Sequence, residues 1–155
     1  MAVRVPTFAN LLAPMRFSAK SDEEFAAHTN RLPLRKQFYQ RMTQKGFGKA
    51  EIEHACDQIR QTCERIEMAL AEAGGPWILG HQFSLVDAQV TPLIDRMEDM
   101  GYGDIWQDLP LMKVWWERMK ERPSYKATFY PAARISERYA DHFRTAEQLR
   151  QERGY

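Results

Sequence analysis

The sequence has few residues that could fix the fold through covalent or metal bonds. Its 155 residues include only two cysteines, Cys56 and Cys63. If both lie on one helix, they stand about 10 Å apart along its axis, which is too far for a disulfide bond between them. Reduced thiols are typical of a cytoplasmic protein, so we expect that location.

Long apolar runs and an excess of one charge are also absent. No window approaches the roughly 18 consecutive apolar residues of a transmembrane helix. Pro6, Pro14 and Arg16 interrupt the N-terminal stretch in which a secretion signal would need an apolar run. The 22 Lys and Arg residues nearly balance 21 Asp and Glu, giving a net charge of +1. Charge therefore gives no reason to expect nucleic-acid or membrane binding.

Sequence motifs of metal, nucleotide and hydrolytic sites are missing as well. The four histidines lie far apart and outside H-E-x-x-H or C-x-x-C patterns. The chain has no P-loop, no G-x-G-x-x-G and no G-x-S-x-G pattern. We therefore predict no metal site and name no catalytic residue. Cys63 is predicted to be buried and inert, although a thiol–imidazole pair of Cys63 with His54 or His28 stays open.

Helical periodicity dominates what is present. Between Lys49 and Ala73, apolar residues recur every three or four positions on one face, and Gly74-Gly75-Pro76 is typical of a helix end. No segment alternates like a β-strand. The pattern predicts one all-α domain over residues 1–155, a bundle of five to seven helices with its core over about 7–130 and a helical tail over 131–155. The other predicted helices cover residues 8–19 with Pro14 as a kink or stop, 21–31 opened by a Ser21/Glu24 capping box, 34–44, 83–100, 111–122 and 132–153.

Ser84 and Asp87 form a second capping pattern. They are three residues apart before an apolar-periodic run, so the Asp87 carboxylate is predicted to accept the N–H of Ser84. We interpret Asp87 as a helix-capping and folding residue rather than a catalytic carboxylate.

Two tryptophans and two arginines follow in the chain. Trp115 and Trp116 point about 100° apart on a helix, so at least one is expected in the core and the other beside a neighbouring helix or cleft. Arg118 and Arg122 are expected to form surface ion pairs with the nearby glutamates 117 and 121.

These features occur in an order that resembles the helical C-terminal domain of cytosolic glutathione transferases. In that family, a thioredoxin-like domain precedes this region and supplies the Tyr, Ser or Cys that activates glutathione. Residues 1–20 do not resemble that domain. Residues 2–19 look as if the chain begins inside the first helix of the family's helical domain, so we expect a fragment, a truncated gene product or one chain of a processed protein. The resemblance covers about residues 7–130 and rests on Trp77–Gly80, Phe83–Asp87, Pro92, Arg96, Leu109-Pro110, Trp115–Arg118 and Arg122–Ser124.

The resemblance implies a binding role for the chain. In the family, the first helix and the C-terminal segment of this domain line most of the pocket for the hydrophobic co-substrate. The resemblance implies glutathione as co-substrate, an apolar small-molecule electrophile as ligand, and a homodimer or a thioredoxin-like domain as partner. The isolated chain is expected to be inactive. The corresponding residues are Phe8, Leu11, Leu12, Met15, Phe17, Phe129 and Tyr130, with Tyr139 as a further candidate; all of them are equally compatible with a purely structural core role.

Three further interpretations remain. Helical domains of this kind are also appended to translation factors and tRNA synthetases, so the chain could be a non-catalytic interaction module with an exposed apolar patch. It could also be a product without a function of its own. Within the enzyme interpretation, the insertion at residues 20–48 and the tail from Tyr130-Pro131 to Arg138-Tyr139 favour the bacterial dehalogenase and ether-cleaving branch.

Overall fold

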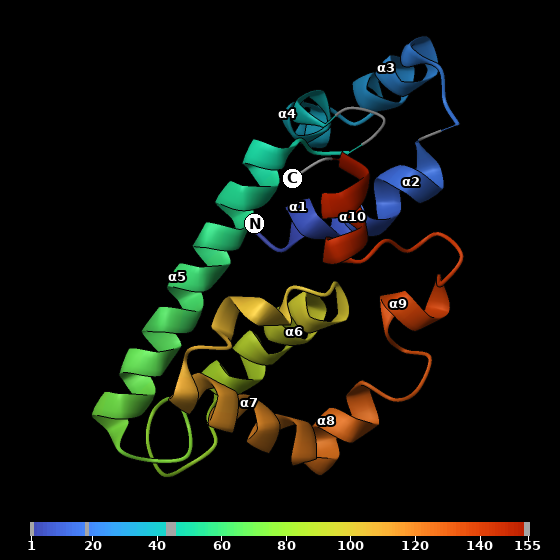
Figure 1. Cartoon of the computed structure of the whole chain (residues 1–155). Helices are drawn as coiled ribbons and strands as arrows, with labels where there is room; N and C mark the ends of the chain where they lie inside the picture. Colours follow the sequence, from blue (N-terminus) through green and yellow to red (C-terminus); the bar gives the residue numbers. More distant parts are fainter. Residues whose placement is uncertain (1, 18, 43–45, 154–155) are drawn as a thin grey trace.

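The longest element of the molecule is α5 (Lys49–Ala73), which runs along one side of it (Figure 1). The computed structural model describes residues 2–17, 19–42 and 46–153. The helix ends at Gly74, whose φ of 62° gives the left-handed C-cap that glycine favours. The apolar face of α5 is buried as the periodicity predicts, except that Ala55 is buried and Cys56 is only half-buried; the buried residues are Ile52, Ala55, Ile59, Cys63, Ile66 and Leu70.

The N-terminal residues form one continuous helix, which we call the first helix and which covers residues 4–16. It consists of α1 (Arg4–Thr7), the π-helical η1 (Phe8–Leu12) and α2 (Ala13–Arg16). It begins four residues before the predicted start and continues through Pro14 to Arg16, so the prediction of a stop at Pro14 was wrong. The predicted end at residue 19 lies just beyond residue 18, which is outside the described residues.

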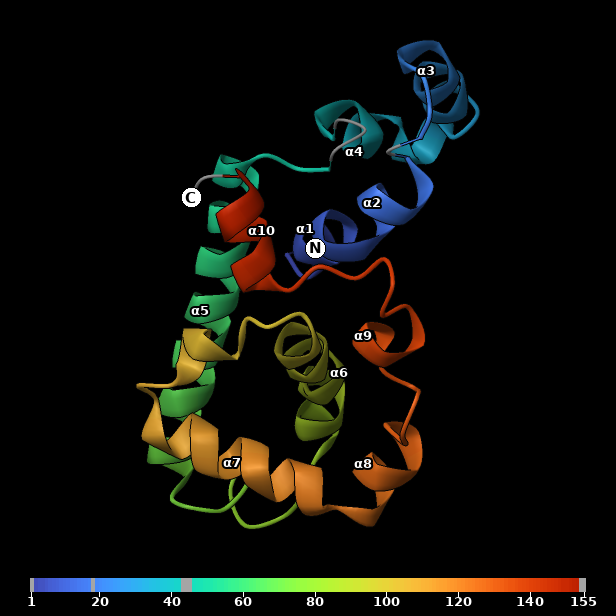
Figure 2. The same ribbon diagram turned by 45° about the vertical axis from the view of Figure 1, so that its right-hand side comes forward.

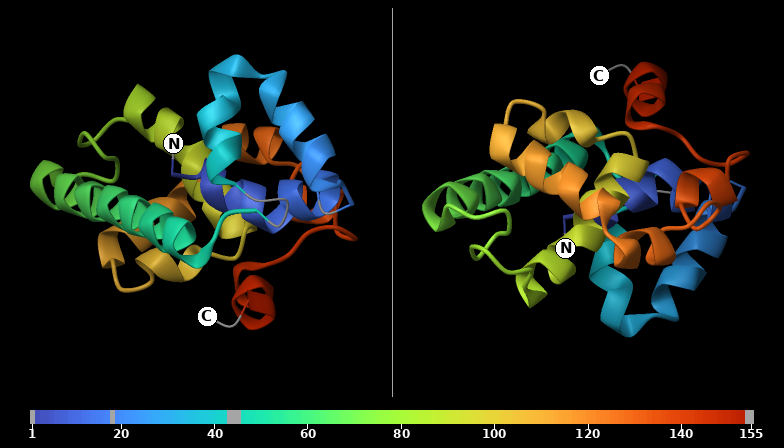
Figure 3. Two further views of the ribbon diagram at one scale, coloured as in Figure 1. Left: turned by 90° about the horizontal axis from the view of Figure 1, so that it is seen from above. Right: turned by 90° about the horizontal axis from the view of Figure 1, so that it is seen from below.

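Two short helices form one end of the molecule. The Ser21/Glu24 capping box opens α3 (Asp22–Asn30), as predicted. A 3-10 turn, η2 (Pro33–Arg35), leads into α4 (Lys36–Arg41). Figure 3 shows α3 and α4 beside each other at one end of the molecule. The predicted helix over 34–44 ends earlier, at Arg41, and its last two residues lie outside the described residues.

The other half of the molecule is built around α6 (Leu85–Asp99). The chain continues through η3 (Gly103–Trp106), α7 (Pro110–Glu121) and α8 (Pro123–Thr128). Figure 2 shows α6 enclosed between α5, α7 and the later segments. Both Trp115 and Trp116 are buried, so neither lies at an open cleft.

The prediction of one long helix over 132–153 was wrong. The segment forms α9 (Ile135–Arg138), an irregular stretch and α10 (Ala146–Arg153). Backbone N–H groups in this stretch donate to other parts of the molecule instead of to their own helix: Arg144 to the Asn10 carbonyl at 2.9 Å and Ala146 to the Met100 carbonyl at 3.1 Å. Phe143, Ala146 and Leu149 are buried in the core, so the core extends past residue 130.

The molecule is an all-α helical bundle, as the sequence predicts. The described residues form no β-strand; Trp77 and Gly80 make one isolated antiparallel bridge. Within the described ranges, every helix falls short of the length and apolarity that crossing a membrane requires.

Candidate ligand-binding site

The first helix widens into a π-helical turn just before Pro14. A proline has no N–H group, so Pro14 cannot donate to the carbonyl of Asn10, four residues earlier. That carbonyl instead accepts the N–H of Arg144. Single π-helical turns within α-helices are frequent at functional sites, which directs attention to the surface beside η1.

The buried side chain of Asn10 holds this turn in place. Its Nδ2 donates to the Arg144 carbonyl at 2.6 Å and to the Met100 carbonyl at 3.3 Å. Its Oδ1 accepts the Tyr102 hydroxyl at 3.3 Å. The π-helical turn is therefore tied both to the end of α6 and to the segment before α10.

A cavity of about 370 Å³ lies beside the first helix, between it and the η2–α4 segment. Small-molecule sites usually have volumes of about 300–1,000 Å³, so this cavity has the size of a binding site. We call it the arginine cavity. It is lined by Arg4, Phe8, Leu12, Arg16, Phe17, Arg35 and Tyr39.

Aromatic rings form one side of the arginine cavity. The Tyr39 ring contacts Phe8 and Phe17 edge-to-face, with centroids 6.1 and 5.9 Å apart. Phe8 also meets Phe38 edge-to-face at 4.9 Å. Such pairs each contribute roughly 0.5–1.5 kcal/mol beyond the area they bury. The aromatic side of the cavity is thus preformed.

Three arginines give the arginine cavity a positive rim. Arg4, Arg16 and Arg35 are all exposed to solvent. The Arg4 guanidinium carbon lies 4.5 Å from the Phe38 ring centroid, within cation–π range. Among residues 2–17, 19–42 and 46–153, no carboxylate forms an ion pair with any of the three arginines.

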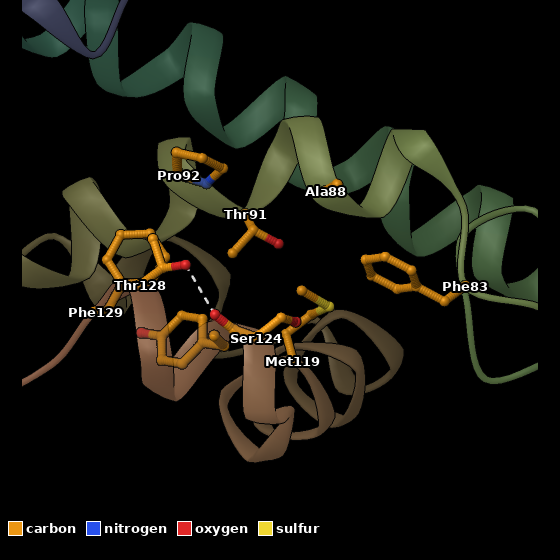
Figure 4. Close-up of a pocket in the computed structure, with 9 residues that line it drawn as sticks. Phe83, Ala88, Thr91, Pro92, Met119, Ser124, Thr128 and Phe129 are labelled. Atoms are coloured by element: carbon orange, nitrogen blue, oxygen red, sulfur yellow. Dashed lines mark hydrogen bonds between the residues drawn. The ribbon is translucent and has the colours of Figure 1, made fainter.

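A second, smaller hollow lies between α6, α7 and α8 (Figure 4). Its volume is about 190 Å³, which is below the usual range for ligand sites. The Thr128 hydroxyl on its wall donates to the Ser124 carbonyl at 2.8 Å. Its lining includes no charged residue: Phe83, Ala88, Thr91, Pro92, Met119, Ser124, Tyr125, Thr128 and Phe129.

The residues named from the resemblance fall in several places. Phe8, Leu12 and Phe17 line the arginine cavity, whereas Phe129 lines the smaller hollow. The remaining candidates line neither: Leu11 is buried in the core, Met15 is half-buried against it, Tyr130 is 58% exposed, and Tyr139 is also exposed.

Sequence reasoning missed the arginines and Tyr39. A signal was available, because Arg4, Phe8, Leu12 and Arg16 recur every four residues. Residues spaced in this way lie along one face of a helix. The contribution of Arg35 and Tyr39 depends on how α4 packs, which no spacing reveals.

The buried Asp87 carboxylate lies at the centre of a hydrogen-bond group. One carboxylate oxygen accepts the N–H and the hydroxyl of Ser84 at 2.9 and 2.7 Å. The other accepts the N–H of Ile78 at 3.1 Å and the indole N–H of Trp115 at 2.9 Å. Burial alone would raise the pKa of Asp87, but these donors outweigh it and the pKa is lowered. The group therefore joins the loop before α6 to α7.

Three more carboxylates on α6 hold the C-terminal segment. Asp95 accepts the Tyr125 hydroxyl at 2.5 Å and pairs with Arg134 at 2.9 Å. Arg134 also lies 3.1 Å from Glu98. Asp99 accepts the N–H of Ile135 at 3.0 Å, at the start of α9. We call these three carboxylates, with Asp87, the α6 carboxylates.

Glu98 has further donors from α7. It accepts the indole N–H of Trp116 at 2.8 Å and pairs with Lys120 at 3.3 Å. Burial acts to raise the pKa of Glu98, yet the Trp116, Lys120 and Arg134 donors lower it overall. Through these contacts Glu98 holds α7 and the segment at Arg134 against α6.

The two arginines expected in ion pairs with glutamates have other partners. Arg118 donates to the Pro76 carbonyl at 2.6 Å. The Arg122 guanidinium lies over the Phe83 ring, 3.6 Å from its centroid. Glu117 pairs instead with Lys120 at 2.7 Å. Both arginines thus fasten the loop before α6, which sequence spacing on α7 alone did not indicate.

The cysteine side chains are not activated as nucleophiles. Burial raises the pKa of Cys63 to about 12 and that of Cys56 to about 11. Both thiols are therefore protonated near neutral pH. In the described part of the chain, no group of three or more His, Cys, Asp and Glu side chains is arranged to hold a metal ion.

One side of α6 exposes apolar residues to solvent. Leu85 is 71% exposed and Leu93 is 44% exposed, and Ala88 and Pro92 between them are exposed too. Their spacing places them along one face of the helix. We call these four residues the outer face of α6.

Fold and site together define an all-α domain with a ligand-sized cavity and a capped, carboxylate-rich helix at its centre. Residues 31–128 match the family model described as glutathione S-transferase, C-terminal domain. The match spans more than half of the chain, so the chain belongs to this family. The comparisons with curated proteins and with solved structures gave no match at the significance required.

The matched span contains one wall of the arginine cavity. Arg35 and Tyr39 lie within residues 31–128, whereas the first helix precedes them. The cavity is therefore formed by a family segment together with an N-terminal helix outside the matched residues.

Proposed function

We propose that this chain is the electrophile-binding helical domain of a glutathione transferase-type enzyme, with the arginine cavity as its co-substrate site. The observation that carries the proposal is a ligand-sized cavity with an aromatic side, in a chain that belongs to this family. Three of the residues that the resemblance assigns to the co-substrate pocket, Phe8, Leu12 and Phe17, line that cavity.

The proposed chemistry is attack of the glutathione thiolate on an electrophilic carbon, with loss of its leaving group. A thioredoxin-like domain would bind glutathione and activate its thiol. This division of roles is consistent with the raised pKa values of Cys56 and Cys63, which leave the chain without a thiolate of its own near neutral pH. The helical domain would bind the electrophile, orient it and exclude water. The dehalogenase and ether-cleaving branch, the cytoplasmic location and the homodimer remain predictions from the sequence.

A pair of calorimetric titrations tests this proposal. We expect a neutral aromatic probe, 2-naphthamide, to bind the purified chain and glutathione not to bind it. Leu12→Ala should weaken the binding of 2-naphthamide, because Leu12 lines the cavity. Leu79→Ala is the matched control, since this leucine is exposed and lies in the loop before α6.

Two results would contradict the proposal. If the chain bound glutathione at sub-millimolar affinity, the division of roles between two domains would be wrong. If neither 2-naphthamide nor its anionic analogue 2-naphthoate bound, or if 2-naphthamide bound equally well to Leu12→Ala, the arginine cavity would not be the co-substrate site.

The outer face of α6 favours a second candidate function, a protein interaction module. Its exposed leucines form a stripe that another protein surface could cover. A thioredoxin-like domain or a second copy of the chain is the partner we would test first. Neither possibility conflicts with binding of a small molecule at the arginine cavity.

Sedimentation velocity over a range of concentrations tests the second candidate. We expect the chain to self-associate as concentration rises, and Leu85→Ser/Leu93→Ser to be monomeric throughout. Leu111→Ser/Val114→Ser removes two exposed apolar residues from α7 instead and should behave like the unchanged chain. A strictly monomeric unchanged chain would rule out the homodimer and leave only a different partner.

A further inference from the structure

We infer that the arginine cavity selects organic anions: aromatic or other apolar molecules that carry a carboxylate or a similarly shaped anionic group. This inference rests on the proposed function, because it specifies which ligand the co-substrate cavity takes. Arg16 and Arg35 are the groups that would distinguish a charged ligand from a neutral one, and the rings of Phe8, Phe17 and Tyr39 would bind its apolar part.

Like charges gather around one cavity. Arg4 and Arg16, at the two ends of the first helix, and Arg35 in η2 line the same 370 Å³ space. Bringing like charges together disfavours the compact state unless an opposite charge balances them. No carboxylate within the described ranges pairs with these arginines, so an anionic ligand would supply the missing charge.

Other arginines of the chain have structural roles. Arg60 forms a two-pronged pair with Asp108, with Nη2 and Oδ2 2.8 Å apart. Arg134 pairs with Asp95 and Glu98. In both cases the guanidinium joins two parts of the fold. Within the described part of the chain, Arg16 and Arg35 join no two segments in this way and instead border a cavity.

The groups that line the cavity match the two ends of such a ligand. A guanidinium presents planar, fork-like donors that suit a carboxylate better than any neutral group. Arg4 is already in contact with Phe38, which leaves Arg16 and Arg35 as the more available donors. The rings of Phe8, Phe17 and Tyr39, which line the same cavity, offer π faces and edges to an aromatic ligand.

The test compares two probes of the same shape and different charge, 2-naphthoate and 2-naphthamide. Calorimetry on the full chain should show 2-naphthoate binding at least tenfold more tightly. In Arg16→Gln/Arg35→Gln this preference should fall to less than threefold, while the affinity for 2-naphthamide stays the same. Arg31→Gln/Arg65→Gln removes the same net charge from exposed positions outside the cavity and should keep the preference.

The outcomes separate this inference from the function on which it rests. Equal binding of the two probes to the unchanged chain would overturn the inference but leave a co-substrate cavity. A preference that survives in Arg16→Gln/Arg35→Gln, or disappears in the control, would overturn the role of these arginines. Failure of both probes to bind would overturn the proposed function as well. If circular dichroism shows that the double variant does not fold, Arg35→Gln alone should reduce the preference at least threefold, and an unreduced preference would overturn the inference.

Discussion

The α6 carboxylates and the rim of the arginine cavity handle charge in opposite ways. On α6, Asp87 is completely buried and both of its oxygens have two donors. Beside the first helix, Arg16 and Arg35 are exposed and pair with no carboxylate of the described chain. The two regions carry charges of opposite sign, and only one region uses its charges to join parts of the fold.

This difference separates stability from binding within one small domain. A buried charge with several donors is strongly destabilising to disrupt, because the donors are left without a partner. An exposed charge without a partner contributes little to folding and remains available to a ligand. We therefore expect substitutions on α6 to lower the free energy of unfolding, and substitutions at the cavity rim to change binding alone.

The largest effect is expected for Asp87→Ala. It leaves the N–H groups of Ile78, Ser84 and Trp115 without their acceptor inside the fold. Each buried donor left without its acceptor costs about 1–3 kcal/mol, so urea unfolding should show a decrease of about 3–5 kcal/mol for these donors together. Asp141→Ala, at an exposed aspartate, should stay within about 0.5 kcal/mol of the unchanged chain. If the two variants had the same free energy of unfolding, Asp87 would contribute no more to stability than an exposed aspartate does.

Arg134→Met should have the next largest effect. It leaves the nearly buried Asp95 without its ion-pair partner and frees α9 from α6. We expect a loss of about 2–3 kcal/mol in urea unfolding, with faster amide hydrogen exchange in residues 132–140. Arg138→Met alters an exposed arginine on the same short helix and is the matched control. Unchanged exchange in α9 would show that Asp99 alone holds this segment.

Lowering the pH should gradually reduce the stability that the α6 carboxylates contribute. Asp87 and Glu98 have folded-state pKa values below their ordinary values of 3.8 and 4.5. The stability that they contribute is fully present above those ordinary values and is lost as the pH falls through the lower, folded-state values. The urea concentration at the midpoint of unfolding, measured from pH 7 to pH 2, should decrease within this pH range. In Asp87→Ala, the fall should be shallower; an identical slope would mean that other carboxylates dominate the acid response.

The smallest expected effect is the chemical labelling of the two cysteine thiols in the folded chain. Burial keeps the Cys63 and Cys56 thiols protonated at pH 7.5, since their pKa values are raised to about 12 and about 11. Iodoacetamide should label neither thiol in the folded chain over minutes, and both in urea, as mass spectrometry would show. Labelling of Cys56 in the folded chain would show that this half-buried thiol is more accessible and more acidic than its raised pKa implies.

Local patterns predicted the parts of the fold that depend on local physics. The buried face of α5 and the start of α6 after Ser84 follow from spacing and capping chemistry. The break between α9 and α10 could not be read in this way, because distant groups such as the Asn10 and Met100 carbonyls take the N–H groups that a helix would use.

The candidate site was only partly predictable for the same reason. Phe8, Leu12 and Phe17 follow from the resemblance and line the cavity. The roles of Arg35 and Tyr39 depend on how α4 packs near the first helix, and Phe129 turned out to line a different hollow. The spacing of Arg4 and Arg16 places them on one face of a helix, but it could not show that no carboxylate of the described residues pairs with them.

The most direct test measures folding and binding on the same two variants. Arg35→Gln and Arg134→Met each remove one guanidinium, the first from the arginine cavity and the second from the α6 carboxylates. We would determine the free energy of unfolding and the affinity for 2-naphthoate for each. We expect Arg35→Gln to lose affinity with unfolding unchanged within about 0.5 kcal/mol, and Arg134→Met to lose stability with its affinity unchanged. If Arg35→Gln were destabilised by as much as Arg134→Met while its affinity stayed the same, the separation of the two roles would be wrong.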